Sequence, residues 1–179
     1  GKNLQGAEQS LRSALEIKPD DLQVQRLLIV LYVESKRYQE ALAIARTVKQ
    51  QRPKEAAGFV LEGDVKTAQK ELDAAAASYR AGLEQVQAPE LAVKLHSVLV
   101  ASGKSADAER LAADWLKKHP QDLVFISYQG DTALARKDYA VAEKSFLAVL
   151  QAQPENAIAL NNLALVSQHL NRAGDRKST

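Results

Sequence analysis

The sequence contains no cysteine and no methionine among its 179 residues, and aromatic residues make up only 5% of it. The absence of cysteine excludes a disulfide framework, cysteine-liganded zinc, iron–sulfur ligation and thiol catalysis. The charges nearly balance, with 24 Lys and Arg against 22 Asp and Glu, so they do not favour a nucleic acid or an acidic membrane as partner. No apolar run approaches the roughly 18–20 residues that span a bilayer, and the N-terminus lacks the pattern of a signal peptide.

Proline recurs with a fixed period. Pro19 and Pro53 are 34 residues apart, and so are Pro120 and Pro154. A period of 20–50 residues is typical of repeat proteins. Alignment on these prolines predicts the second helix of a truncated repeat over 1–21, full repeats over 22–55, 56–88, 89–122 and 123–156, the first helix of a partial repeat over 157–170, and a disordered tail over 171–179.

The same kinds of residue recur at fixed places in each repeat. A small residue stands at the eighth place as Gly63, Gly130 and Ala164, with Ile29 and His96 as exceptions. An Ala stands twelve places later in each unit. Four residues after that Ala comes a larger apolar residue, such as Leu11, Tyr79 or Phe146, but Ala45 and Ala112 in two units.

Apolar residues spaced one, three and four apart, interrupted by short polar breaks, predict two helices joined by a turn in each repeat. Leu27, Leu28 and Leu31 belong to such a stripe, and Lys36-Arg37 interrupts it before the next one begins. Small residues let paired helices approach closely. We therefore expect an all-α superhelix, an α-solenoid of antiparallel helix pairs with almost no strand.

The pattern resembles the tetratricopeptide repeat, a helix–turn–helix unit of 34 residues, over residues 1–170. Gln129-Gly130-Asp131 is similar to motifs of ordinary members of this superfamily. A narrower resemblance, carried by Lys94-Leu95-His96, Trp115–Pro120 and Ala159–Ala164, links the chain to the tetratricopeptide lipoproteins of the PEP-CTERM/exosortase system in bacteria. This narrower resemblance implies a scaffold in the cell envelope, on the periplasmic side of a lipid-anchored parent, with a role in protein sorting or exopolysaccharide assembly. A cytoplasmic parent is the alternative.

Stacked repeats place the first helix of each pair on the concave face. The second, fifth, ninth and twelfth places of the repeat are expected to face this groove. The predicted partner-binding residues are Arg26, Val30, Val33, Val60, Asp64, Val93, Ser97, Val100, Val124, Asp131, Leu134 and Asn161. Two interpretations stay open: these side chains bind an extended or helical peptide, or the Val residues only pack against neighbouring first helices.

Several single residues carry expectations of their own. Asp64 and Asp131 share the ninth place and either contact a basic partner or are solvated helix acids. His96 is expected to be a packed, partly buried imidazole. Trp115 is expected to be a core or inter-repeat anchor, with an exposed contact as the alternative. The residues expected in the core are Tyr32, Tyr79, Tyr139 and Phe146.

The sequence offers no candidate catalytic, cofactor or metal site, and we expect no enzyme. It has no recognisable nucleophile–base pair and no glycine-rich phosphate loop, and its three histidines lack the spacing of a metal site. Some members of the superfamily hold a C-terminal carboxylate with Lys and Asn at the second and sixth places. Here only Lys94 and Asn162 have that chemistry, and they lie two repeats apart, so we exclude this clamp.

These observations predict an interaction scaffold whose partner is a protein or peptide, with no nucleic acid and no membrane contact by this segment. The alternative is a structural or self-association module that positions other domains or forms a homo-oligomer end to end. Because the chain starts at Gly1, within a repeat, we expect a piece of a longer solenoid. Apolar stripes at Leu4, Leu11 and Leu15 would then be exposed cut faces.

Overall fold

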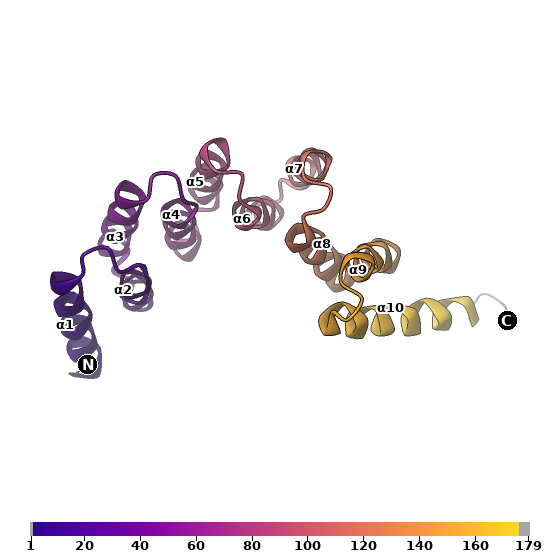
Figure 1. Cartoon of the computed structure of the whole chain (residues 1–179), viewed down its shortest axis with the longest axis horizontal. Helices are drawn as coiled ribbons and strands as arrows, with labels where there is room; N and C mark the ends of the chain where they lie inside the picture. The colour runs from indigo at the N-terminus through magenta and orange to yellow at the C-terminus, as the bar shows by residue number, and fades with distance from the viewer. Residues whose placement is uncertain (1, 176–179) are drawn as a thin grey trace. The chain divides into compact units, whose positions relative to one another are not determined.

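The structure is a computed structural model that describes the backbone of residues 2–175 and the side chains of residues 4–170. Within this part of the chain it contains ten helices and no strand (Figure 1). Their bounds are α1 Lys2–Ile17, α2 Leu22–Glu34, α3 Tyr38–Gln51, α4 Ala57–Ala68, α5 Leu72–Gln85, α6 Pro89–Ala101, α7 Ser105–Lys118, α8 Leu123–Ala135, α9 Tyr139–Ala152 and α10 Ala157–Asp175. The predicted all-α fold is confirmed, and each expected full repeat contains two helices.

The helices form two compact units, one made by the described residues up to Asp114 and the other beginning at Trp115. In the first unit each helix packs on the next from α1 to α6, and the first helices α2, α4 and α6 also contact one another in sequence. In the second unit α8 packs on α9, α9 on α10, and α8 also contacts α10. The last helix continues to Asp175, beyond residue 170 where we expected a tail, and residues 176–179 lie outside the described part.

The turn inside each repeat has the same backbone conformation. The fifteenth place of every full repeat has a positive φ, at Lys36 (57°), Lys70 (64°), Gly103 (76°) and Lys137 (62°). In the first of these turns the Arg37 amide donates to the Tyr32 carbonyl at 2.7 Å, and the Lys36 amide donates to the Val33 carbonyl at 3.0 Å. These two bonds end a helix in the left-handed conformation, and equivalent pairs recur in the other three turns.

The regular spacing of small and aromatic places reflects direct packing between the two helices of a repeat. A Cβ built on Gly63 would lie 2.2 Å from the Tyr79 ring, and one on Gly130 would lie 2.8 Å from the Phe146 ring. Tyr79 and Phe146 are buried, as is Tyr32, which confirms three of the four expected core aromatics. Tyr139 is only half-buried and stacks on the His169 ring, with 4.7 Å between centroids.

A charged network joins α1 to the first full repeat. The Glu8 carboxylate accepts hydrogen bonds from Arg37 Nη1 at 2.6 Å, Arg12 Nε at 3.0 Å and the Tyr32 hydroxyl at 3.0 Å. The Glu8 side chain is only 17% exposed. The hydrogen bond from Arg37, aided by Arg12 and Tyr32, lowers the pKa of Glu8 from 4.5 to about 2, although its partial desolvation opposes this. Ionised Glu8 therefore stabilises the docking of α1.

This network predicts a loss of stability in acid. Because the folded pKa of Glu8 lies below its ordinary value, its contribution is complete above pH 4.5 and disappears as the pH falls towards about 2. The free energy of unfolding, measured by urea titration across this range, should fall more steeply for the natural chain than for Glu8→Gln. Glu16→Gln, at an exposed position of the same helix, is the control and should leave the slope unchanged. Equal slopes for the natural chain and Glu8→Gln would contradict this assignment.

Candidate functional site

Each unit presents one face made by the first helices of its repeats. We call these the α2–α4–α6 face and the α8–α10 face. On them the predicted groove residues differ in exposure: Val30, Ser97, Val124, Asp131 and Asn161 are exposed, Arg26, Val33, Asp64, Val93, Val100 and Leu134 are half-buried, and Val60 is buried. Val33 and Leu134 pack against core clusters of their units.

The expectation that Val60 contacts a partner is wrong. Its side chain is only 3% exposed. The physical reason is that α4 packs against four helices, α2, α3, α5 and α6, and this apolar side chain in its first turn is buried among its surroundings. Val60 is therefore a buried residue, and a charge placed there would test the core rather than a binding surface.

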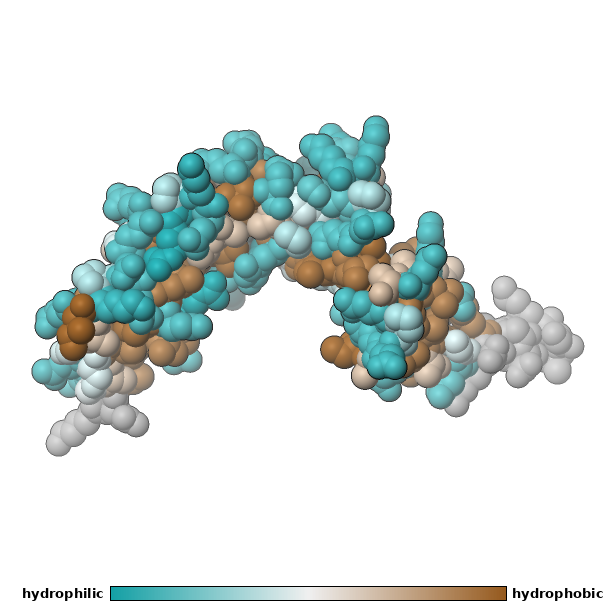
Figure 2. Space-filling model, in the orientation of Figure 1, coloured by the Kyte–Doolittle hydropathy of each residue, from teal (hydrophilic) through white to brown (hydrophobic). Residues whose placement is uncertain are grey.

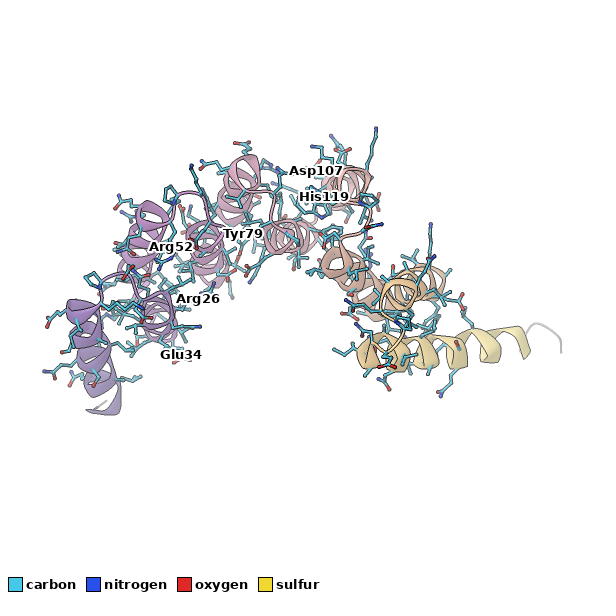
Figure 3. All side chains as sticks on the ribbon, in the orientation of Figure 1. Arg26, Glu34, Arg52, Tyr79, Asp107 and His119 are labelled. Atoms are coloured by element: carbon cyan, nitrogen blue, oxygen red, sulfur yellow. The ribbon has the colours of Figure 1, made fainter. Side chains whose placement is uncertain are left out.

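The negative charge of Asp64, on the α2–α4–α6 face, is paired with a cation of the same chain. Lys94 Nζ on α6 donates to Asp64 Oδ1 at 2.8 Å and to Oδ2 at 3.0 Å. The Tyr79 hydroxyl on α5 donates to Asp64 Oδ1 at 2.6 Å. Figure 3 labels Tyr79 among the side chains of this unit. Burial raises the pKa of Tyr79, and the hydrogen bond to Asp64 raises it further, so the phenol stays a donor. The negative charge of Asp64 is thus balanced by Lys94.

Asp131, at the same place on the α8–α10 face, has a different partner. Asn162 Nδ2 on α10 donates to Asp131 Oδ1 at 3.0 Å. Asp131 as a residue is exposed, but partial burial of its carboxyl group raises its pKa, while the Asn162 hydrogen bond opposes that rise. An amide carries no charge, so this pair keeps the full negative charge of the carboxylate.

Large apolar side chains are exposed on the two helices that hold this pair. Val124 on α8 is 59% exposed, and Ile158 and Leu165 on α10 are 73% and 41% exposed. All three stand at places of the repeat that were predicted to face a groove. Figure 2 shows hydrophobic surface over α8 and around the start of α10. The α8–α10 face therefore combines an anionic group with apolar area.

Trp115 and His96 are both packing residues. Trp115 is 4% exposed and its Nε1 donates to Asp122 Oδ2 at 2.6 Å, while its ring lies 4.1 Å from the His119 ring, centroid to centroid. The expectation of a core anchor is confirmed, and the alternative of an exposed contact is wrong. His96 is buried, as expected.

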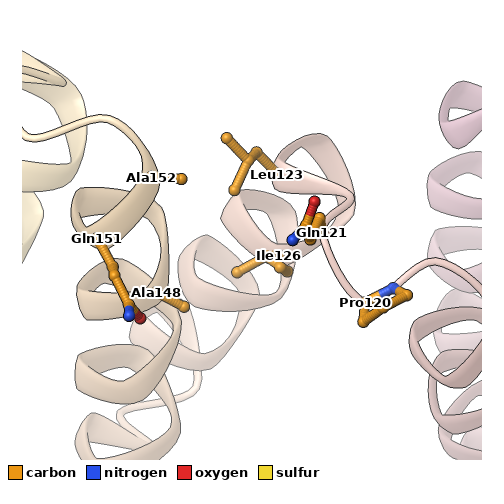
Figure 4. A pocket seen from close by; sticks show the side chains of 7 residues that line it. All are labelled: Pro120, Gln121, Leu123, Ile126, Ala148, Gln151 and Ala152. Atoms are coloured by element: carbon orange, nitrogen blue, oxygen red, sulfur yellow. The ribbon is translucent and has the colours of Figure 1, made fainter.

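A cleft of about 470 Å³ opens in the second unit between the turn before α8, the start of α8 and the end of α9 (Figure 4). It is lined by Pro120, Gln121, Leu123, Ile126, Ala148, Gln151 and Ala152. Ile126 stands at the fourth place of its repeat. At this place the second full repeat has Phe59, which is buried. The first full repeat has Gln25, which donates a hydrogen bond to Gln51 at 2.7 Å. None of the lining residues is titratable, so the cleft offers no acid–base chemistry.

Metal binding and membrane crossing find no support in the described residues. No group of three or more His, Asp or Glu there is placed to hold a metal ion. None of the helices in that same part of the chain is both long and apolar enough to cross a membrane.

Two residues with the chemistry of a carboxylate clamp are already engaged. Lys94 and Asn162 both stand at the sixth place of their repeats, and each donates to the Asp at the ninth place of the repeat before. Sequence reasoning noted these four residues separately but did not pair them. Their offsets of 30 and 31 residues were the signal that could have done so.

Comparisons with known proteins agree with this architecture. Two family models, both described as tetratricopeptide repeat, match residues 2–61 and 129–175, together more than half of the chain. No curated protein sequence matches it significantly.

Solved structures share the fold. A tetratricopeptide repeat protein from Thermus thermophilus has a TM-score of 0.66 at 15% identity, covering 92% of this chain and 91% of that one. One from Parabacteroides merdae has a TM-score of 0.59 at 16% identity, covering 99% and 71%. The first tetratricopeptide repeat of Spaghetti (RPAP3), bound to the HSP90 peptide SRMEEVD, has a TM-score of 0.51 at 25% identity, covering 65% and 93%. The recurring turn, the paired small and aromatic places and the matching family models together show that this chain belongs to the tetratricopeptide repeat family.

Proposed function

We propose that the chain is a protein-interaction module without enzymatic activity, which binds a peptide segment of a partner protein on its α8–α10 face. The observation that carries this proposal is the exposure of Val124, Ile158 and Leu165 on the two helices that hold the Asp131–Asn162 pair. Apolar side chains at helical spacing, with a few polar groups among them, form the kind of surface on which peptides dock. The peptide-bound structure of the first tetratricopeptide repeat of Spaghetti supports a binding role for this fold.

The partner contact can be tested with peptides selected from a random-sequence display library on the immobilised chain. Val124→Lys and Ile158→Lys place charges at exposed positions, so the fold should be retained while the affinity of the selected peptides falls at least about tenfold. Leu147→Lys is the matched control, because Leu147 is exposed on the second helix α9. The proposal fails if no peptide is enriched, or if the selected peptides bind both variants as tightly as the natural chain.

Self-association is a second candidate function, favoured by the exposed side chains of Leu4 and Ile17 on α1 and of Leu160 on α10. Apolar side chains on unpaired helix faces are what a neighbouring repeat would cover. Light scattering over a concentration series should then show dimers without any peptide, and Ile17→Lys should reduce them. A monomer at every concentration would exclude this function.

We also propose a bacterial envelope location and a role in protein sorting or exopolysaccharide assembly for the parent protein. The support is the resemblance carried by Trp115–Pro120 and Ala159–Ala164 to lipoproteins of the PEP-CTERM/exosortase system. Determining the N-terminus of the parent reading frame tests it. A signal sequence ending in a lipidated cysteine supports the proposal, and a plain cytoplasmic start overturns it.

A further inference from the structure

We infer that the peptide bound on the α8–α10 face carries a Lys or Arg side chain next to apolar residues, and that Asp131 receives this cation. The inference rests on the proposed function and specifies the chemistry of the partner. The chain holds two equivalent pairs, Asp64 with Lys94 and Asp131 with Asn162, and only the first contains a cation.

The two pairs occupy the same places of the repeat. In the first unit, the Asp64 carboxylate receives Lys94 Nζ on both of its oxygens and the Tyr79 hydroxyl on one of them. In the second unit, the Asp131 carboxylate receives Asn162 Nδ2 on Oδ1. Where the first unit supplies its own cation, the second supplies a neutral amide. A carboxylate has about four lone-pair sites, so the Asn162 bond leaves room for a bidentate cation.

The surroundings of Asp131 favour a cation from outside. Partial burial raises the pKa of Asp131 and the Asn162 hydrogen bond lowers it, and neither influence is a charged partner. A carboxylate charge is favoured by an opposite charge within about 4–6 Å. A basic side chain of a bound peptide would play the part that Lys94 plays at Asp64.

The neighbouring surface specifies the rest of the ligand. Val124, Ile158 and Leu165 expose apolar area on the same face. A peptide with one basic residue flanked by Leu, Ile, Val or aromatic residues would match both the charge and the apolar surface. The SRMEEVD peptide carried by the Spaghetti neighbour has three acidic residues. Such a peptide would bring like charge towards Asp131, so we expect it to bind this face poorly.

The test gives the second pair the sixth-place residue of the first. Asn162→Lys copies the Lys94 arrangement beside Asp131 and should reduce the affinity of basic peptides at least about tenfold, by fluorescence anisotropy, without loss of helicity. Asp131→Asn, nearly isosteric, should have the same effect and covers the case in which Asn162→Lys does not fold. Asp73→Asn is the control, because Asp73 on the second helix α5 accepts from Lys104 Nζ at 2.6 Å and stands at none of the predicted groove places, and it should leave peptide affinity unchanged.

The outcomes separate this inference from the proposed function. Enrichment of basic and apolar peptides, whose affinity falls with added salt and with Asp131→Asn, supports both. Enrichment of neutral peptides that Val124→Lys weakens and Asp131→Asn leaves unchanged, or of acidic peptides that Asp131→Asn does not weaken, overturns the inference alone. Enrichment of no peptide overturns the proposed function itself.

Discussion

Replacing Gly63 with Ala should lower the free energy of unfolding by about 2–3 kcal/mol, measured by urea denaturation. The new Cβ would lie 2.2 Å from Cε1 of Tyr79, far inside van der Waals contact. The ring cannot move aside freely, because Tyr79 is buried and its hydroxyl donates to Asp64 at 2.6 Å. Overpacking a rigid ring therefore outweighs the gain of about 1 kcal/mol that Ala has over Gly in a helix.

The clash can be isolated by a double-mutant cycle. In a Tyr79→Ala background the space beside residue 63 is empty, so Gly63→Ala should cost nothing or become stabilising. Gly6→Ala is the control in the same unit, because its Cβ would meet nothing within 4 Å. We expect Gly6→Ala to stabilise the chain by about 0.5–1 kcal/mol. An equal cost of Gly63→Ala in both backgrounds would contradict the packing explanation.

The residues that recur at fixed places of the repeat made the fold predictable, because each place has one physical role. The eighth place of a repeat packs against the place sixteen residues later. In two repeats this pair is a Gly and an aromatic residue, Gly63 with Tyr79 and Gly130 with Phe146. In the first full repeat it is Ile29 with Ala45, and both belong to one core cluster. Ile29 and His96, the two exceptions to a small residue at the eighth place, were visible in the sequence. What went unnoticed was that a large residue at one place accompanies a small one at the other, which keeps the packed volume nearly constant.

The candidate site was less predictable, because helical periodicity fixes a direction but not the distance to the neighbouring helix. Val60 has the periodicity of a groove residue, yet it is buried on a helix that packs against four other helices. Asp64 was predicted to be either free for a partner or solvated, yet Lys94 from the next first helix reaches it. Contacts between successive repeats depend on side-chain length and on helix separation, and neither follows from the spacing of apolar residues.

Replacing Trp115 with Ala should lower the free energy of unfolding by about 3–5 kcal/mol, because it removes a large buried side chain and leaves a cavity. Trp115 is 4% exposed, and its ring packs near the rings of His119 and Phe125. It is the chain's only Trp, so the variants are compared by far-ultraviolet circular dichroism in urea rather than by fluorescence. Leu147→Ala, at an exposed position of α9, should change the stability by less than about 0.5 kcal/mol.

Trp115→Phe separates the hydrogen bond from the packing. Phenylalanine keeps most of the ring but cannot donate the 2.6 Å hydrogen bond to Asp122 Oδ2. The other oxygen of Asp122 caps α8 by accepting from the amides of Val124 and Phe125. A hydrogen bond to a charged group contributes about 1.5–3 kcal/mol, so Trp115→Phe should cost clearly less than Trp115→Ala. A cost near zero for Trp115→Phe would mean that the start of α8 is positioned by its cap alone. A loss in the free energy of unfolding below about 1 kcal/mol for Trp115→Ala would contradict the assignment of Trp115 as a core anchor.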